Sequence, residues 1–220
     1  MGKIADIRRQ QKDPNRFNVY VDGQFAFGIS AEIRFEKKLE IDQKLSEKQV
    51  EDLINLDQTE RLLNKALNFI SFRPRSEKEI REHLLRKGKL KEVKGEVEKT
   101  QYEFSVGEVL RRLKKLGQIN DRTFASWWID QRNRFRPCGQ RLLRIELRAK
   151  GVSKEIIDES LCINDEDQMQ LALAAASKKM KLLKKYNEEE IRLKIGQFLL
   201  RRGFDWNIIK KVVDTLIRKG

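Results

Sequence analysis

The stretch that decides the fold, residues 73–88, reads RPRSEKEIREHLLRKG, and residues 136–151 repeat its plan as RPCGQRLLRIELRAKG. Each stretch opens on an Arg-Pro pair and ends on a glycine fourteen residues after the proline, with apolar residues eight and four positions before that glycine. A third copy ends at Gly203 and lacks the proline. Self-similarity at a spacing of about fifty residues predicts stacked supersecondary units.

Each copy predicts a helix with a defined start and stop. Proline ends the incoming helix, because its ring disfavours helical geometry at the preceding residue. Ser76 with Glu79 forms a capping-box pattern, and Gly139 takes the place of Ser76 in the second copy. We expect the closing glycines to adopt a left-handed conformation, and Asp121 to cap the helix that follows the stop at Gly117. The structural motif comprises Pro74, Ser76, Gly88, Gly117, Asp121, Pro137, Gly151 and Gly203.

The other helices of the repeats have caps of the same kind. Asn187 opens the second helix of the third copy, and Ser153 and Asp205 open the third helices of copies two and three. In copy one that cap is Ser105, so residues 89–104 form an insertion. Their charge-rich composition indicates an exposed excursion that can extend a helix.

The first 57 residues predict a different module. Three β-rich runs occupy residues 4–7, 17–21 and 25–27. Asp22-Gly23 stands between the last two runs and is typical of a tight type I′ hairpin. Ser30 predicts the cap of a short helix over 31–38, and Ser46 with Gln49 predicts a second helix through Leu53-Ile54. A meander this small should pack on a helix.

The expected fold is mainly α: tandem three-helix repeats forming an elongated stack, with a small N-terminal β-hairpin/α module. The expected domains are residues 1–57, repeat one at 58–118, repeat two at 119–165 and repeat three at 166–220. The first helices of the three repeats should span residues 62–72, 124–135 and 171–186. One repeat buries too little surface to be very stable alone, so neighbouring repeats should stack.

The charge points to an acidic partner. The 220 residues carry 48 Lys and Arg against 34 Asp and Glu, a formal charge of +14. Residues 1–57 hold ten basic and eleven acidic side chains, so the whole excess follows residue 57. Such a field attracts polyanions or acidic protein surfaces. The longest uncharged stretch, 168–177, is too short to cross a bilayer, and no secretion signal is recognisable. We expect a cytoplasmic monomer that does not bind membranes.

Catalytic and metal sites are not predicted. His83 has no second histidine, and Cys138 and Cys162 are too few for a zinc cluster. No phosphate-loop motif occurs, and no paired carboxylates suggest a hydrolase. Trp127 and Trp128 should place at least one ring in the core, with base stacking as the alternative. We expect no enzymatic activity, no metal and no cofactor.

The repeats resemble the RecX family, modulators of the RecA recombinase. The resemblance is carried by residues 73–88, by LGQINDRTFA at 116–125 and by the second copy through Ile156-Ile157. It extends over about residues 60–218, and the N-terminal hairpin is similar to that of longer family members. The insertion at 89–104, Cys138 and the missing proline of copy three depart from the family pattern. The resemblance implies three three-helix repeats, no catalysis, and docking on RecA filaments that blocks their ATPase and strand-exchange activities.

Basic side chains supply the candidate binding surface. Arg141, Arg144 and Arg148 share one helix face by their spacing, and Lys178, Lys181 and Lys185 repeat that spacing. A plain solvated surface is the alternative interpretation. The partner-binding candidates, for the RecA filament or DNA, are Arg73, Arg75, Arg111, Arg112, Lys114, Lys115, Arg132, Arg134, Arg136, Arg141, Arg144, Arg148, Lys178, Lys181 and Lys185. The alternative function is sequence-independent binding of single- or double-stranded DNA without RecA.

Overall fold

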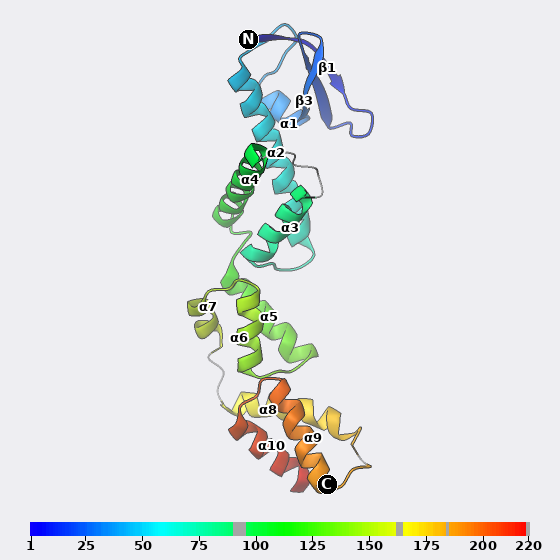
Figure 1. Cartoon of the computed structure of the whole chain (residues 1–220), viewed down its shortest axis with the longest axis vertical. Coiled ribbons are helices and arrows are strands. Elements are labelled where there is room, and N and C mark those ends of the chain that lie inside the picture. The colour runs from blue at the N-terminus through cyan, green and yellow to red at the C-terminus, as the bar shows by residue number, and fades with distance from the viewer. Residues whose placement is uncertain (90–95, 162–164, 184, 219–220) are drawn as a thin grey trace. The chain divides into compact units, whose positions relative to one another are not determined.

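The computed structural model describes residues 1–89, 96–161, 165–183 and 185–218. The chain divides into two compact units. The first contains Met1–Phe72 and Ile80–Gln118, and the second contains Arg73–Glu79 and Ile119–Gly220. Figure 1 labels the helices and strands of both units.

The first unit begins with a four-stranded antiparallel sheet of order β3-β2-β1-β4. Its strands are β1 (Gly2–Arg9), β2 (Arg16–Val21), β3 (Gln24–Ser30) and β4 (Lys44–Leu45). The hairpin prediction is confirmed: Asp22 and Gly23 have φ of 50° and 81°, the two positive values that a type I′ turn requires. The short strand β4 was not predicted from the sequence.

Helix α2 (Glu47–Ser71) corrects the prediction of two separate helices around residue 57. The predicted capping box at Ser46 and Gln49 is confirmed, and the helix then runs without a break for 25 residues. Asp57, in its middle, is buried and accepts hydrogen bonds from Arg16 and from the backbone N–H of Ser30. This ionic contact ties α2 to the sheet, and the short helix α1 (Ala31–Glu36) begins at Ser30 as predicted.

Helices α3 (Glu77–Lys89) and α4 (Glu96–Lys115) correct two predicted helix ends. Gly88 is helical within α3, which runs on to Lys89, so the predicted stop at Gly88 is not observed. Ser105 is not a cap either: it is buried within α4, and its Oγ donates to the carbonyl of Gln101. Of the predicted insertion, Glu96–Phe104 extend α4, and residues 90–95 lie outside the described residues.

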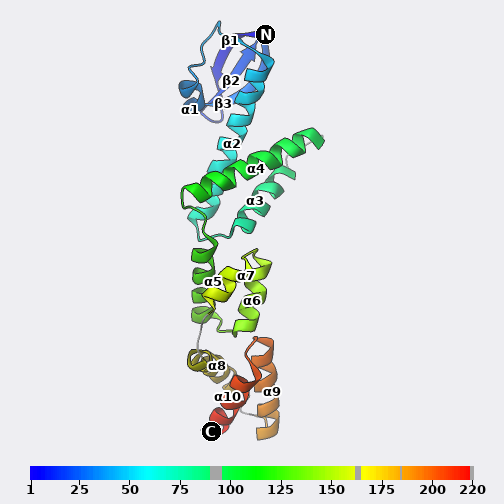
Figure 2. The same cartoon turned by 90° about the vertical axis from the view of Figure 1, so that its left-hand side faces the viewer.

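The second unit contains two three-helix repeats (Figure 2). Repeat two consists of α5 (Asp121–Phe135), α6 (Gln140–Ala149) and α7 (Lys154–Ser160), and repeat three of α8 (Asp165–Met180), α9 (Glu188–Arg201) and α10 (Trp206–Arg218). Each repeat has its own core of buried apolar side chains. The chain is therefore mainly helical, as predicted, with a small strand module at its start.

The helix stops of the second unit follow the prediction, and one start does not. Gly151 and Gly203 have φ of 83° and 78°, the left-handed conformation expected after a helix. Asn120, and not Asp121, is the N-cap of α5, because its side chain accepts from the N–H groups of the next helical residues. Asp121 instead accepts a hydrogen bond from the backbone N–H of Glu77.

Candidate partner-binding surface

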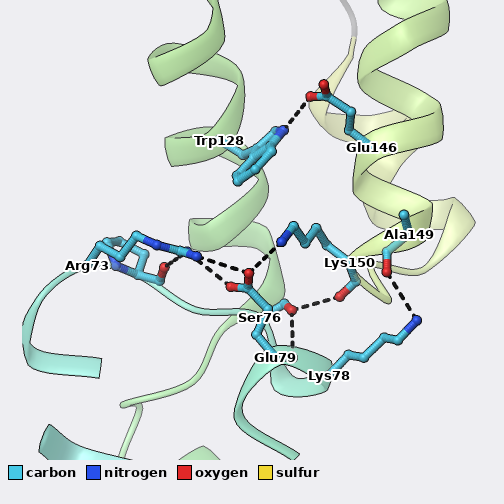
Figure 3. A network of polar contacts seen from close by, with 9 residues as sticks. Arg73, Ser76, Lys78, Glu79, Trp128, Glu146, Ala149 and Lys150 are labelled. Carbon is cyan, nitrogen blue, oxygen red and sulfur yellow. Dashed lines mark hydrogen bonds and ion pairs between the residues drawn. The ribbon is translucent and has the colours of Figure 1, made fainter. Parts of the chain in front are cut away.

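The first turn of α3 is held on repeat two by a polar network (Figure 3). Ser76 Oγ accepts from Glu79 N, as its cap role predicts, and donates to the carbonyl of Lys150 at 2.7 Å. The Glu79 carboxylate accepts two hydrogen bonds from Arg73, both at 3.0 Å, and one from Lys150 Nζ at 2.7 Å. Burial raises the pKa of Glu79, but the hydrogen bonds from these two cations outweigh it and hold the pKa below its usual value.

Two predicted binding residues thus belong to this network or lie beside it. The Arg73 guanidinium is bound to Glu79 and lies 5.3 Å from the ring centre of Trp127. Arg75 is half-buried, and burial followed by the charge of Arg73 lowers its pKa. Arg73 therefore stabilises the junction between copies one and two, and its charge is already bound by Glu79.

A second junction joins repeats two and three by backbone contact. Gly139 N donates to the carbonyl of Arg202 at 2.9 Å, and Arg202 Nη1 donates to the carbonyl of Pro137 at 2.8 Å. A Cβ on Gly139 would lie 2.1 Å from the carbonyl oxygen of Gly203. Gly139 is the N-cap of α6 as predicted, but this close approach, which the sequence analysis missed, also requires a glycine.

The basic cluster at the end of α4 is partly neutralised within the first unit. Arg111 is paired with Glu108 one turn earlier, and Arg112 with Glu60 of α2. Lys114 and Lys115 are exposed. Cations in the last turn of a helix are favourable because they face the negative end of its dipole. At least Arg111 and Arg112 of this cluster therefore serve the fold.

The stripe on α6 is divided in the same way. Arg141 and Arg148 are exposed, whereas Arg144 is paired with Asp158 of α7. The hydrogen bond from Arg144 lowers the pKa of Asp158, and the charge of Arg148 adds to the effect. Few acids interleave with this stripe in the sequence, and the acid that pairs with Arg144 comes from another helix.

Three further predicted arginines lie at the end of α5. Arg132 donates to Glu146 at 2.8 Å and lies 4.9 Å from the ring centre of Trp128. Arg134 is exposed and lies 3.6 Å from Asp130. Arg136 is exposed, and its guanidinium has no carboxylate partner among the described residues.

The lysine stripe predicted for repeat three does not lie on one helix. Helix α8 ends at Met180, earlier than the predicted residue 186, because the chain turns there to bury Leu183 in the repeat-three core. Lys178 is on α8, Lys181 follows its end, and Lys185 lies 5.4 Å from the ring centre of Tyr186. All three lysines are exposed, but the i, i+3, i+7 spacing does not place them on a common helical face.

The residues with possible chemistry are used in packing. His83 stacks on Phe69 with ring centres 3.9 Å apart. Trp127 and Trp128 pack against the core of repeat two, and Trp128 Nε1 donates to Glu146 at 2.9 Å. Burial raises the pKa of Cys138 to about 11, which disfavours the nucleophilic thiolate. Cys162 lies outside the described residues, and within them no group of three or more His, Cys, Asp or Glu could hold a metal ion.

Sequence reasoning missed two basic residues, Arg201 and Arg202. With Arg132 and Arg136 they line a pocket of about 260 Å³ in the second unit, together with Cys138, Leu142, Glu146 and Phe198. The signal that could have found them is the alignment of the copies, since Arg202 precedes Gly203 as Lys150 precedes Gly151.

Family models match the chain along most of its length. The RecX N-terminal domain matches residues 2–46, and the first, second and third RecX three-helix domains match residues 63–93, 120–161 and 165–213. None of the helices in the described part of the chain is long and apolar enough to span a membrane.

Curated relatives and solved structures agree with these matches. Regulatory protein RecX of Bacillus subtilis (strain 168) is 30% identical over 214 residues, which cover 97% of this chain and 76% of the relative. Regulatory protein RecX of Clostridium perfringens (strain 13 / Type A) is 31% identical over 219 residues, covering 98% and 97%. A crystal structure of regulatory protein RecX aligns with a TM-score of 0.70 at 26% identity, covering 97% of this chain and 100% of that one. A RecX structure from Lactobacillus salivarius aligns at 24% identity with a TM-score of 0.59, covering 73% and 97%, and supports the fold.

Proposed function

The chain belongs to the RecX family of regulatory proteins, and from this premise we propose that it is a non-enzymatic regulator that binds the RecA–DNA filament. Bound there, it inhibits the ATPase, strand-exchange and coprotease activities of RecA and thereby modulates recombination and DNA repair. The curated relatives are named regulatory proteins, which supports a role without catalysis of its own.

One observation carries the proposal: the repeats hold exposed arginines that the fold does not use. Arg136 and Arg141 are exposed, and neither has an ion-pair partner among the described residues. A guanidinium presents a fixed fork of donors suited to carboxylate and phosphate, so such side chains favour an acidic partner.

Single contacts of this kind are weak, at about 0.2–1 kcal/mol each for exposed ion pairs. Linked repeats compensate, because the binding of one repeat raises the effective concentration of the next at its own site. Inhibition should therefore require the connected repeats, and no isolated repeat should suffice.

The test is the DNA-dependent ATPase of RecA measured with sub-stoichiometric protein. We expect inhibition by the wild type and strong weakening by Arg141→Glu/Arg148→Glu, because charge reversal replaces attraction by repulsion. The matched control is Lys12→Glu/Lys48→Glu, which makes the same charge change at exposed positions of the N-terminal module. Full RecA ATPase activity in the presence of the wild type would refute the proposal. An equal loss of inhibition in both variants would show that only the net charge of the protein matters, and not the position of these arginines.

Binding to naked DNA, measured over a series of salt concentrations, distinguishes the proposed function from direct DNA binding without RecA. A protein that acts through DNA alone binds tightly without RecA, and the logarithm of its affinity falls linearly with the logarithm of salt concentration. Tight naked-DNA binding together with unchanged RecA kinetics would favour the alternative function.

A further inference from the structure

The two junctions of the second unit join equivalent residues of successive copies. Ser76 and Gly139 stand two residues after the prolines, and Lys150 and Arg202 stand one residue before the closing glycines. At the first junction Ser76 Oγ donates to the carbonyl of Lys150, and at the second Gly139 N donates to the carbonyl of Arg202. Equivalent residues thus meet in both places.

The junctions differ at the position of Glu79. At the first, Arg73 and Lys150 converge on the Glu79 carboxylate, whose side chain is only 11% exposed (Figure 3). At the second, Arg136 and Arg202 take the places of these two cations. The residue five positions after the proline, where Glu79 stands in copy one, is Leu142. The second junction therefore keeps both cations and has no carboxylate at the position of Glu79.

The place of the missing carboxylate opens on the 260 Å³ pocket, which we name the arginine pocket after Arg132, Arg136, Arg201 and Arg202. The carboxylate of Glu146 also lines it. Oε2 of that carboxylate already accepts from Arg132 at 2.8 Å and from Trp128 at 2.9 Å. Arg136 and Arg201 have no ion-pair partner among the described residues, so positive charge is in excess here.

Arg202 is held in this pocket at an electrostatic cost. One of its N–H groups donates to the carbonyl of Pro137, and its guanidinium lies 4.6 Å from the ring centre of Phe198. Burial, and then the charge of Arg136, lower its pKa. A half-buried cation beside a like charge is stabilised by an anion, as the equivalent Lys150 is by Glu79.

We propose that the arginine pocket binds a phosphate group from outside the chain, in the place equivalent to the Glu79 carboxylate. Arg136, Arg201 and Arg202 would hold it. At the first junction two cations bind one carboxylate. The arginine pocket has three guanidinium groups, which carry more positive charge and more hydrogen-bond donors than one carboxylate can neutralise and accept. A phosphate, with charge up to about −2 and three or more acceptor oxygens, matches that excess better than a carboxylate does.

The affinity of the pocket for phosphate does not depend on the proposed function. The identification of its source does rest on that function, because a RecA–DNA filament offers phosphate both in its DNA and in its bound nucleotide. Both sources present a phosphate group, and separate titrations with oligonucleotide and with ATP distinguish them.

The experiment titrates the full chain with inorganic phosphate at constant ionic strength, by calorimetry and by thermal unfolding. We expect the wild type to bind and to unfold at a higher temperature in phosphate than in chloride. Arg136→Gln/Arg201→Gln should bind about tenfold more weakly or worse, since a charge-assisted hydrogen bond contributes about that factor. The matched control, Arg122→Gln/Arg192→Gln, removes two exposed arginines of the same unit outside the pocket and should bind like the wild type.

A second variant tests the comparison of the junctions directly. Leu142→Glu supplies the carboxylate that the first junction has, so it should remove the response to phosphate and raise the unfolding temperature in chloride. Absence of phosphate binding by the wild type, or equal weakening in the control variant, would overturn the proposal. Preference for a glutamate-rich peptide over every phosphate compound would overturn the assignment to phosphate. Phosphate binding by a wild type that leaves RecA unaffected would refute the proposed function and retain the pocket.

Discussion

The substitution Gly139→Ala tests the backbone contact between repeats two and three. The new Cβ would lie 2.1 Å from the carbonyl oxygen of Gly203 and 2.4 Å from its carbonyl carbon. Carbon–oxygen contacts of about 3.3 Å or more are normal, so the start of α6 and the end of α9 must separate by about 1 Å. That movement weakens the 2.9 Å hydrogen bond from Gly139 N to the carbonyl of Arg202.

The cost follows from these two effects. Overpacking a well-packed contact costs about 1–3 kcal/mol, and the lost hydrogen bond contributes about 0.5–1.5 kcal/mol. We therefore expect the free energy of unfolding to fall by about 2–4 kcal/mol. Gly139→Ser should cost a similar amount, although it restores the cap residue of copy one, because its Cβ meets the same carbonyl.

The assay is denaturant unfolding followed by helical circular dichroism. Gly196→Ala is the matched control, since Gly196 lies inside α9 and its Cβ would make an ordinary contact of 3.9 Å with Ile209. Alanine there should stabilise by about 0.5–1 kcal/mol, the usual gain over glycine in a helix. Wild-type stability of Gly139→Ala, or equal destabilisation by both variants, would refute the assigned contact.

Three further predictions follow from single groups or segments. The pKa of Glu79 lies below its unfolded value, so its ionised form stabilises the fold at neutral pH and loses that effect as pH falls through the folded-state pKa. The stability difference between wild type and Glu79→Gln, measured by unfolding across a pH series, should therefore shrink in acid. With its pKa raised to about 11, Cys138 should react slowly with iodoacetamide in the folded protein and rapidly after denaturation, as followed by peptide mass spectrometry. Removal of residues 1–57 should leave a helical protein that melts cooperatively. The reason is that the buried residues in the remaining part of α2, Leu62, Leu63 and Ala66, lie after the cut. Aggregation of the shortened protein would count against this boundary.

The elements that could be predicted are those set by residues acting locally. A left-handed glycine ends a helix wherever it is followed by an apolar residue and a cap, as at Gly151 and Gly203. Asp22-Gly23 sets a hairpin by its own backbone preference, and Asn187 caps α9 with Glu190 three residues later. Three-helix repeats and the strand module followed from such signals without knowledge of tertiary contacts.

The features that could not be predicted depend on residues distant in sequence. Helix α2 runs unbroken through residue 57, where the buried Asp57 is paired with Arg16, 41 residues earlier, a contact that the local sequence does not reveal. Ser105 has the sequence pattern of a cap, but its hydroxyl bonds the carbonyl four residues back, which a serine inside a helix does equally well. The ion pair of Arg144 with Asp158 could not be predicted either, because it joins two different helices.

The two junctions show how one packing arrangement can carry two kinds of chemistry. Equivalent residues meet in both, through the Ser76 hydroxyl at the first junction and the Gly139 N–H at the second, and each junction has a pair of cations beside the start of the neighbouring copy's helix. With Glu79 present the cations are neutralised inside the chain, and the contact stabilises the fold. With Leu142 in its place, the corresponding cations, Arg136 and Arg202, line the arginine pocket, where we propose that they bind an external anion. The side chain five positions after the proline, Glu79 or Leu142, therefore decides whether these two cations are neutralised by that position inside the chain.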